Sequence, residues 1–149
     1  MVAFAPEPER VRYTRRVVTT MLRHWRLEHL RDTAELVASE LVTNAILHAR
    51  DQHLITVTVE RDEQWLSIAV KDRSTDLPRT AQALPGHENG RGLLLVEHFA
   101  DSWLCESHSD GTKTVSCRLS IASAAPRTPS VQGGRSARPG PWKISEGSS

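Results

Sequence analysis

The sequence predicts an α+β fold: a two-layer α/β sandwich in which helices cover one face of a mostly antiparallel sheet. Two observations support this prediction. Helical periodicity marks two long segments near the N-terminus, and two pairs of alternating strands are each joined by a polar turn. The helices are expected at 8–27 and 32–49, and the strands at 54–61, 65–72, 100–107 and 112–121.

The first predicted helix is amphipathic, with Val11, Val18 and Leu22 among its apolar positions and arginines over the rest. A short connection follows it, and Asp32 or Thr33 can cap the second helix, which runs to about Ala49. The two helices are therefore expected to pack as consecutive neighbours.

The strands are predicted from apolar residues at every second position, as in Ile55, Val57 and Val59. Asp110-Gly111 is a strong turn pair between the last two strands. Periodicity disappears from 73 to 91, and a helix is expected to start near Leu93, directly behind two glycines. A loop of that length in a compact domain is usually functional, often a lid.

Length and composition limit the function classes. The 149 residues suit one domain, expected over 1–122, followed by a disordered tail over 123–149 that is rich in Ser, Gly, Pro and Arg. The 19 basic and 18 acidic residues argue against bulk electrostatic binding to nucleic acid or to a membrane. No leader or membrane-length apolar run is evident, so a cytoplasmic protein with reduced Cys105 and Cys117 is expected.

The most informative segment lies in the second helix. Glu40, Asn44 and His48 are spaced i, i+4, i+8 and fall within an arc of roughly 80°. Apolar residues surround them, as in a buried helix. A carboxylate and a carboxamide there need partners, which a metal ion, a water, a ligand or other protein groups can supply.

Three further features follow in order along the chain. Asp72 ends a buried strand, where it either caps a turn or accepts a hydrogen bond from a ligand amine. Gly90 and Gly92 precede a helix whose free N–H groups can face an anion, although such a pattern alone is weak. Thr114 opens the last strand, either as an ordinary strand residue or as a hydrogen-bonding partner of a ligand.

Together, these features in this order resemble the GHKL (Bergerat-type) ATP-binding fold. The likeness is strongest to its small anti-sigma-factor serine/threonine kinases and to the related stand-alone ATPase domains of actinobacteria. It covers residues 8–121, and the block Glu40-Leu41-Val42-Thr43-Asn44-Ala45 is its most specific part. The resemblance implies that ATP lies between the helical layer and the lid.

The resemblance assigns roles around the nucleotide. Glu40 would be the general base, with a pKa raised by a partly apolar pocket. Asn44 would coordinate Mg²⁺ through its side-chain oxygen. Asp72 would accept from the adenine amine and so select ATP, and Ser74 would lie close to the nucleotide.

The resemblance also implies a phosphate-binding end of the site. The N–H groups of the lid and of the helix start, at Gly90, Gly92 and Leu93, would bind the phosphates. Arg91 and Lys113 are cations that could neutralise developing charge, the former inferred from its position. Thr114 would lie under the adenine, and His48 is assigned no chemistry.

The implied partners are a sigma factor and an antagonist (anti-anti-sigma) protein that is phosphorylated on serine, and the resemblance leaves a homodimer open. Two rival functions are a catalytically inactive nucleotide-binding module that regulates by capturing its partner, and a simple ATPase. The chain departs from the Asp-x-Gly-x-Gly pattern of the wider superfamily, because 72–79 contains no glycine. This departure favours the inactive module, whereas Glu40 and Asn44 favour the kinase.

Overall fold

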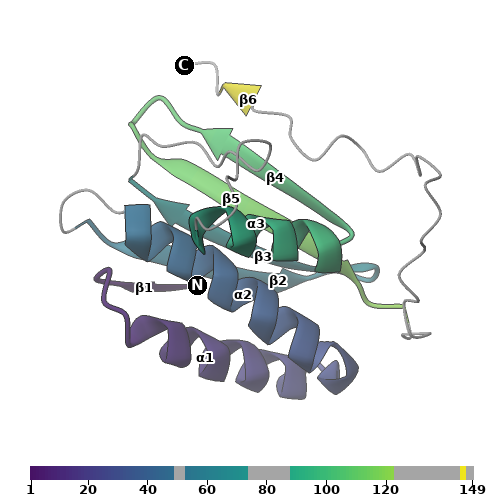
Figure 1. The fold of residues 1–149 in the computed structure, drawn as a ribbon. Helices are drawn as coiled ribbons and strands as arrows, with labels where there is room; N and C mark the ends of the chain where they lie inside the picture. Colours follow the sequence, from purple (N-terminus) through teal and green to yellow (C-terminus); the bar gives the residue numbers. More distant parts are fainter. Residues whose placement is uncertain (49–52, 74–87, 123–144, 147–149) are drawn as a thin grey trace.

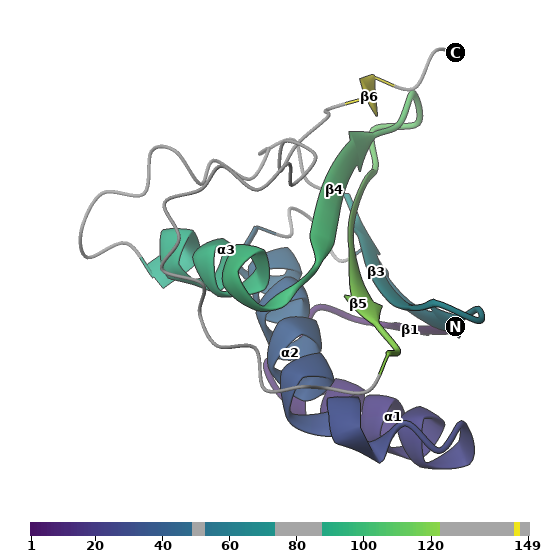
Figure 2. The same ribbon diagram turned by 90° about the vertical axis from the view of Figure 1, so that its right-hand side faces the viewer.

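One sheet with a layer of helices on a single face makes up the part of the chain that the computed structural model describes (Figures 1 and 2). That part is 1–48, 53–73, 88–122 and 145–146; for 88–93 and 145–146 only the backbone is described. We call the sheet face that packs on the helices the inner face and the opposite one the outer face. The predicted α+β fold with a mostly antiparallel sheet is confirmed.

Within the described residues the sheet has six strands, in the order β1-β2-β3-β5-β4-β6. Neighbouring strands are antiparallel except β4 and β6, which are parallel. Because β5 lies between β3 and β4, the chain crosses over the sheet between those two strands. The strands are β1 (Val2–Phe4), β2 (Ile55–Arg61), β3 (Trp65–Asp72), β4 (Ser102–Ser107), β5 (Lys113–Ser120) and β6 (Ser145–Glu146).

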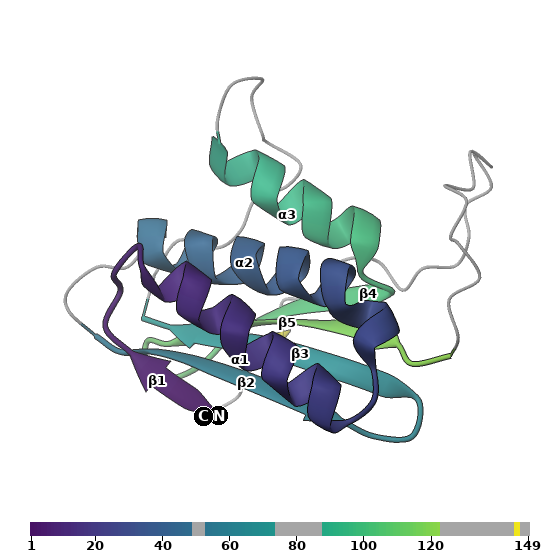
Figure 3. The same cartoon turned by 90° about the horizontal axis from the view of Figure 1, so that it is seen from below.

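In the part of the chain that the structure describes, three α-helices form the second layer, and α2 lies between the other two (Figure 3). A short 3₁₀ helix, η1 (Glu28–Leu30), leads into α2. The α-helices are α1 (Arg10–His24), α2 (Arg31–His48) and α3 (Glu88–Phe99). Of the helices in the described ranges, none is long and apolar enough to span a membrane.

The central position of α2 explains its composition. A helix with neighbours on both sides and a sheet beneath it must be apolar around most of its circumference. Its buried residues indeed occupy several faces, and they include Val37, Ala38, Leu41, Val42 and Ala45. The helix predicted to be buried is therefore the buried one.

The core lies between this helix layer and the inner face. Strand residues alternate between the two faces, so every second residue enters the core. In β3 and β5 these are Leu66, Ile68, Val70, Val115, Cys117 and Leu119. Cys105 and Cys117 are both buried and free, and their strands are in register so that Cys105 lies opposite Val115 and Cys117 opposite Trp103.

The structure differs from the expected elements in three places. Strand β1, which pairs with β2, is not among the expected strands, because three residues are too few to show an alternation of apolar and polar positions. Helix α3 begins at Glu88, so Gly90 and Gly92 lie inside its first turns and do not precede it. Glycine costs a helix only about 1 kcal/mol, and no proline follows to interrupt it. The expected lid, 74–87, lies outside the described residues.

The third difference concerns the expected tail. Ser145–Glu146, within the segment predicted to be disordered, form β6 beside β4. The remainder of that segment, 123–144 and 147–149, lies outside the described residues. The boundary at 122 therefore stays a prediction.

Candidate functional site

Glu40 and Asn44 lie one turn apart on α2, so their side chains share a face of that helix. The Asn44 side chain is buried, with 6% of the residue exposed, whereas Glu40 is partly exposed. The carboxamide of Asn44 is therefore in the interior, and the carboxylate of Glu40 lies beside it, partly exposed to solvent. Both are oxygen donors of the kind that hard cations and proton transfer require.

The Glu40 carboxyl has the protonation behaviour expected from the sequence. Burial raises its pKa above the ordinary value of 4.5, and the positive charge of Arg15 opposes part of that rise. A raised pKa brings the proton affinity of a carboxylate closer to neutral pH, where general bases are most effective. The expected direction of the shift is thus confirmed.

Arg15 reaches this region from α1. Its Nε atom donates a hydrogen bond of 2.6 Å to the Ser39 hydroxyl, one residue before Glu40. Ser39 in turn donates to the Glu35 carbonyl oxygen at 2.6 Å. Arg15 is therefore fixed by a hydrogen bond next to the carboxylate whose charge it stabilises.

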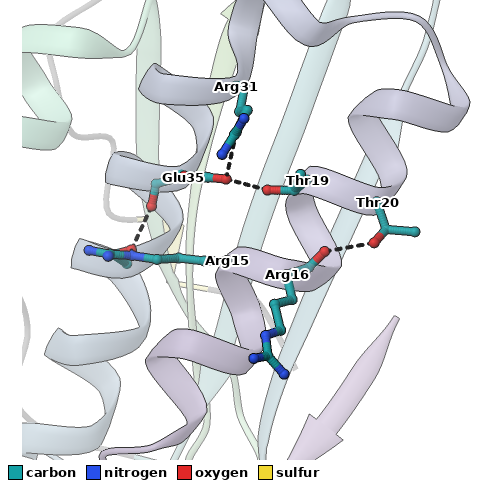
Figure 4. A network of polar contacts seen from close by, with 7 residues as sticks. Arg15, Arg16, Thr19, Thr20, Arg31 and Glu35 are labelled. Carbon is teal, nitrogen blue, oxygen red and sulfur yellow. Dashed lines mark hydrogen bonds and ion pairs between the residues drawn. The ribbon is translucent and has the colours of Figure 1, made fainter.

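The same pair of helices is joined by a second group of polar contacts (Figure 4). The Glu35 carboxylate accepts hydrogen bonds from the Thr19 hydroxyl on α1 and from Arg31 Nε one turn earlier, the latter at 3.2 Å. The hydrogen bond from Thr19 is the main reason why the pKa of Glu35 is lowered. Of these two contacts, the one between Thr19 and Glu35 joins α1 to α2 and so helps to place Arg15 beside Glu40.

Asp72 is the last residue of β3 and is buried, with 3% of it exposed. It lies directly opposite Lys113, the first residue of β5, which is 1% exposed. The Lys113 Nζ atom is 3.9 Å from Asp72 Oδ1. A full pair of opposite charges is thus buried at this end of the inner face.

Topology brings the two halves of the site to one end of the molecule. Strand β2 follows α2 in the chain and runs antiparallel to β3, so the end of β3 lies at the end where α2 finishes. Helix α3 finishes at the opposite end, because β4 then starts beside Arg118, near the end of β5. The first turns of α3 therefore lie at the end of the molecule where α2 finishes, as Figures 1 and 3 show.

The structure does not bring Thr114 together with Asp72. Alternation in β5 places Lys113, Val115 and Cys117 on the inner face and Thr114 on the outer face. There the Thr114 hydroxyl is hydrogen-bonded to His108 Nε2 at 2.8 Å. The residue of β5 on the side of Asp72 is therefore Lys113, and the position of Thr114 under the adenine stays a prediction.

Lys113 is also placed differently from expectation. The sequence suggested a cation near the phosphates, whereas the structure pairs this lysine with Asp72. Its position was nevertheless readable, because Val115, Cys117 and Leu119 set a period of two that includes residue 113. No comparable signal in the sequence points to Arg15, which depends on the packing of α1 against α2.

Four of the remaining predicted residues lie near the start of α3. Gly90, Arg91, Gly92 and Leu93 lie in its first two turns, but their side chains are outside the described part. The first four N–H groups of a helix have no partner within it and carry its positive dipole end. Those N–H groups belong to 88–91 here. Ser74 lies outside the described residues.

Comparison with protein families decides the identity of this arrangement. The family model of the histidine kinase-like ATPase domain matches residues 4–119, which is most of the chain. The chain belongs to this family. None of the curated proteins matches it significantly.

Membership makes the chain a GHKL-type, ATP-binding, kinase-like domain. The matched range contains the buried Asn44, the Glu40 carboxylate and the Asp72–Lys113 pair. Mg²⁺ in nucleotide sites is usually held by one or two protein oxygens together with phosphates. The Asn44 amide oxygen suits that cation, so the residues present fit an ATP–Mg²⁺ complex.

Proposed function

We propose that this histidine kinase-like ATPase domain binds ATP with Mg²⁺ and acts as an anti-sigma-factor-type protein serine/threonine kinase. Its acceptor is a serine of an antagonist protein, and its other partner is a sigma factor. The observation that carries the proposal is Glu40: a carboxylate with a raised pKa, one turn from the buried Asn44 oxygen.

In this proposal Glu40 accepts the proton of the acceptor serine as the serine oxygen forms a bond to the γ-phosphorus. The bond from that phosphorus to the β–γ bridging oxygen breaks, and ADP leaves. Mg²⁺, when bound, spreads the charge of the phosphate oxygens. Asn44 would hold the metal, while the N–H groups at the start of α3 would bind phosphate oxygens.

Arg15 supports the same step as a positioning residue. Its charge favours the ionised form of Glu40, and burial favours the protonated form. The balance leaves the carboxylate able both to accept a proton and to release it. Asp72 selects adenine among the nucleobases by accepting a hydrogen bond from its amine.

Calorimetry with ATP tests the first part of the proposal, with and without Mg²⁺. We expect binding that tightens with Mg²⁺ in the natural protein and no Mg²⁺-dependent tightening in Asn44→Ala. Thr43→Ala, the preceding helix position, is the matched control and should keep the Mg²⁺ response. No ATP binding at millimolar concentration would overturn the proposal.

Transfer of labelled γ-phosphate to candidate antagonist proteins from the same organism tests the catalytic part. Glu40→Gln should abolish transfer while ATP binding persists, and Glu60→Gln, an exposed carboxylate on β2, should leave transfer intact. Full transfer by Glu40→Gln would show that this residue is not the base.

A second function is supported by the segment after Asp72. The run 72–79 has no glycine to allow close approach of the backbone to a nucleotide. In this alternative the domain binds nucleotide without turnover and regulates transcription by capturing its partner. ATP binding and sigma-factor capture without any phosphate transfer would establish it.

A further inference from the structure

The buried pair of Asp72 and Lys113 carries a further inference. Both residues are almost fully buried, and Lys113 is the largest of the fully buried side chains. The distance of 3.9 Å between Nζ and Oδ1 exceeds that of a hydrogen bond, so the two groups attract each other without direct hydrogen bonding. An ammonium has three donors and a carboxylate has several acceptor sites, so each group can contact more than one partner at a time.

Stability alone is a weak reason for such a pair. Removing a lysine and an aspartate from water costs free energy that their attraction repays only partly. Apolar residues of similar volume are often at least as stable in such places. A buried charge pair at the ligand-binding end of a fold therefore points to recognition.

The pair presents an acceptor and a donor side by side. Asp72 and Lys113 are directly opposite each other on neighbouring strands, and both face the helix layer. The matching ligand edge has a donor next to an acceptor. The Watson–Crick edge of adenine has that order, with the exocyclic amine beside the ring nitrogen N1.

We propose that Lys113 is a specificity-determining residue that donates a hydrogen bond to N1 of adenine while Asp72 accepts from the amine. This inference rests on the proposed binding of ATP and adds a second contact to the base. Guanine in the same orientation would place its exocyclic oxygen against the carboxylate and its N1–H against the ammonium. Both contacts would be repulsive, so the pair selects ATP over GTP.

The test compares ATP with 1-deaza-ATP, in which N1 is replaced by C–H and the amine is retained. Calorimetry on the natural protein should give binding of 1-deaza-ATP weaker by on the order of 10-fold or more, the loss of one hydrogen bond to a charged group. Equal binding of the two nucleotides overturns the inference while the proposed function stands. Failure to bind ATP at all overturns the proposed function itself.

Substitution then identifies the donor. Lys113→Met should weaken ATP binding and bring the ratio of the two affinities close to one. Lys71→Met is the matched control, because Lys71 lies beside this pair on the outer face and is exposed; it should keep the full ratio. If Lys113→Met does not fold, Lys113→Gln replaces it and should reduce the ratio of the affinity for ATP to the affinity for 1-deaza-ATP.

A purely structural role for Lys113 gives a different result. The substitution would then lower the free energy of unfolding but leave the preference for ATP over 1-deaza-ATP unchanged. That outcome overturns the inference, as does a loss of preference in Lys71→Met equal to that in Lys113→Met.

Discussion

Asp72 and Lys113 face each other across β3 and β5, with their charged atoms 3.9 Å apart in the interior. Each residue makes burial of the other tolerable, since a lone charge in the core is far more costly than a pair. If the proposed contacts to adenine hold, recognition of the nucleotide and stability of the fold depend on the same two side chains.

Breaking the pair should destabilise the protein. Lys113→Met leaves Asp72 as an uncompensated buried charge, so we expect the free energy of unfolding to fall by about 3 kcal/mol. The double variant Asp72→Asn/Lys113→Met should lose less than the sum of the two single variants. Urea denaturation measures all three, with exposed Lys71→Met as the control near zero. Additive losses would show that the two charges do not interact.

Glu40→Gln should stabilise the fold at neutral pH. The folded-state pKa of Glu40 is raised above 4.5, so the folded protein holds this proton more tightly than the unfolded chain. Stability from this group is present below pH 4.5 and is lost as pH rises toward the folded-state pKa. The glutamine of the Glu40→Gln variant does not ionise, so this variant does not lose stability in this way as pH rises.

The measurement is the melting temperature of both proteins as a function of pH. We expect Glu40→Gln to melt higher than the natural protein at pH 7 and by a smaller margin at pH 4. Glu60→Gln on β2 should show no such pH-dependent difference. A lower melting temperature for Glu40→Gln at pH 7 would contradict the raised pKa.

Arg15→Met should raise the pKa of Glu40 further. The positive charge of Arg15 is the contribution that opposes burial, and its removal leaves burial alone. Titration of the Glu40 carboxyl carbon by NMR measures the shift directly. Arg16→Met, an exposed neighbour on α1, should leave the titration unchanged. If the proposed function holds, phosphate transfer by Arg15→Met should need a higher pH.

The two cysteines should be inert in the folded protein. Burial raises the pKa of Cys105 to about 11 and that of Cys117 to about 12. At pH 8 both are thiols, and the thiolate is the reactive form. A chromogenic disulfide reagent should label neither residue in buffer and both in urea. Rapid labelling of the native protein would contradict their burial.

Much of the fold could be predicted from local patterns. The period of two in Ile55, Val57 and Val59 reflects which side of the strand meets the core. The turn at Asp110-Gly111 requires a residue that tolerates a positive φ, and Gly111 has a φ of 82°. The start of α3 was not predictable in this way, because Gly90 and Gly92 are poor helix formers that tertiary context overrides.

The candidate site was also partly predictable from local patterns. Glu40 and Asn44 share a face through helix geometry alone, which any helical sequence with that spacing has. Arg15 reaches Glu40 only because α1 packs on α2, and that packing depends on contacts such as Thr19 with Glu35. Because Arg15 and Glu40 are far apart in the chain, no local sequence pattern could show that they would lie close together.

The sequence by itself determined the helices α1 and α2, the strands β2 to β5 and the polar motif on α2, because each arises from the periodicity of neighbouring residues. Only the tertiary structure decided which residue of β5 meets Asp72. Lys113 and Thr114 are adjacent in the chain and face opposite sides of the sheet. Alternation along β5 places Lys113 on the inner face, whereas the register with β3 decides that Lys113, and not the next inner residue Val115, lies directly opposite Asp72.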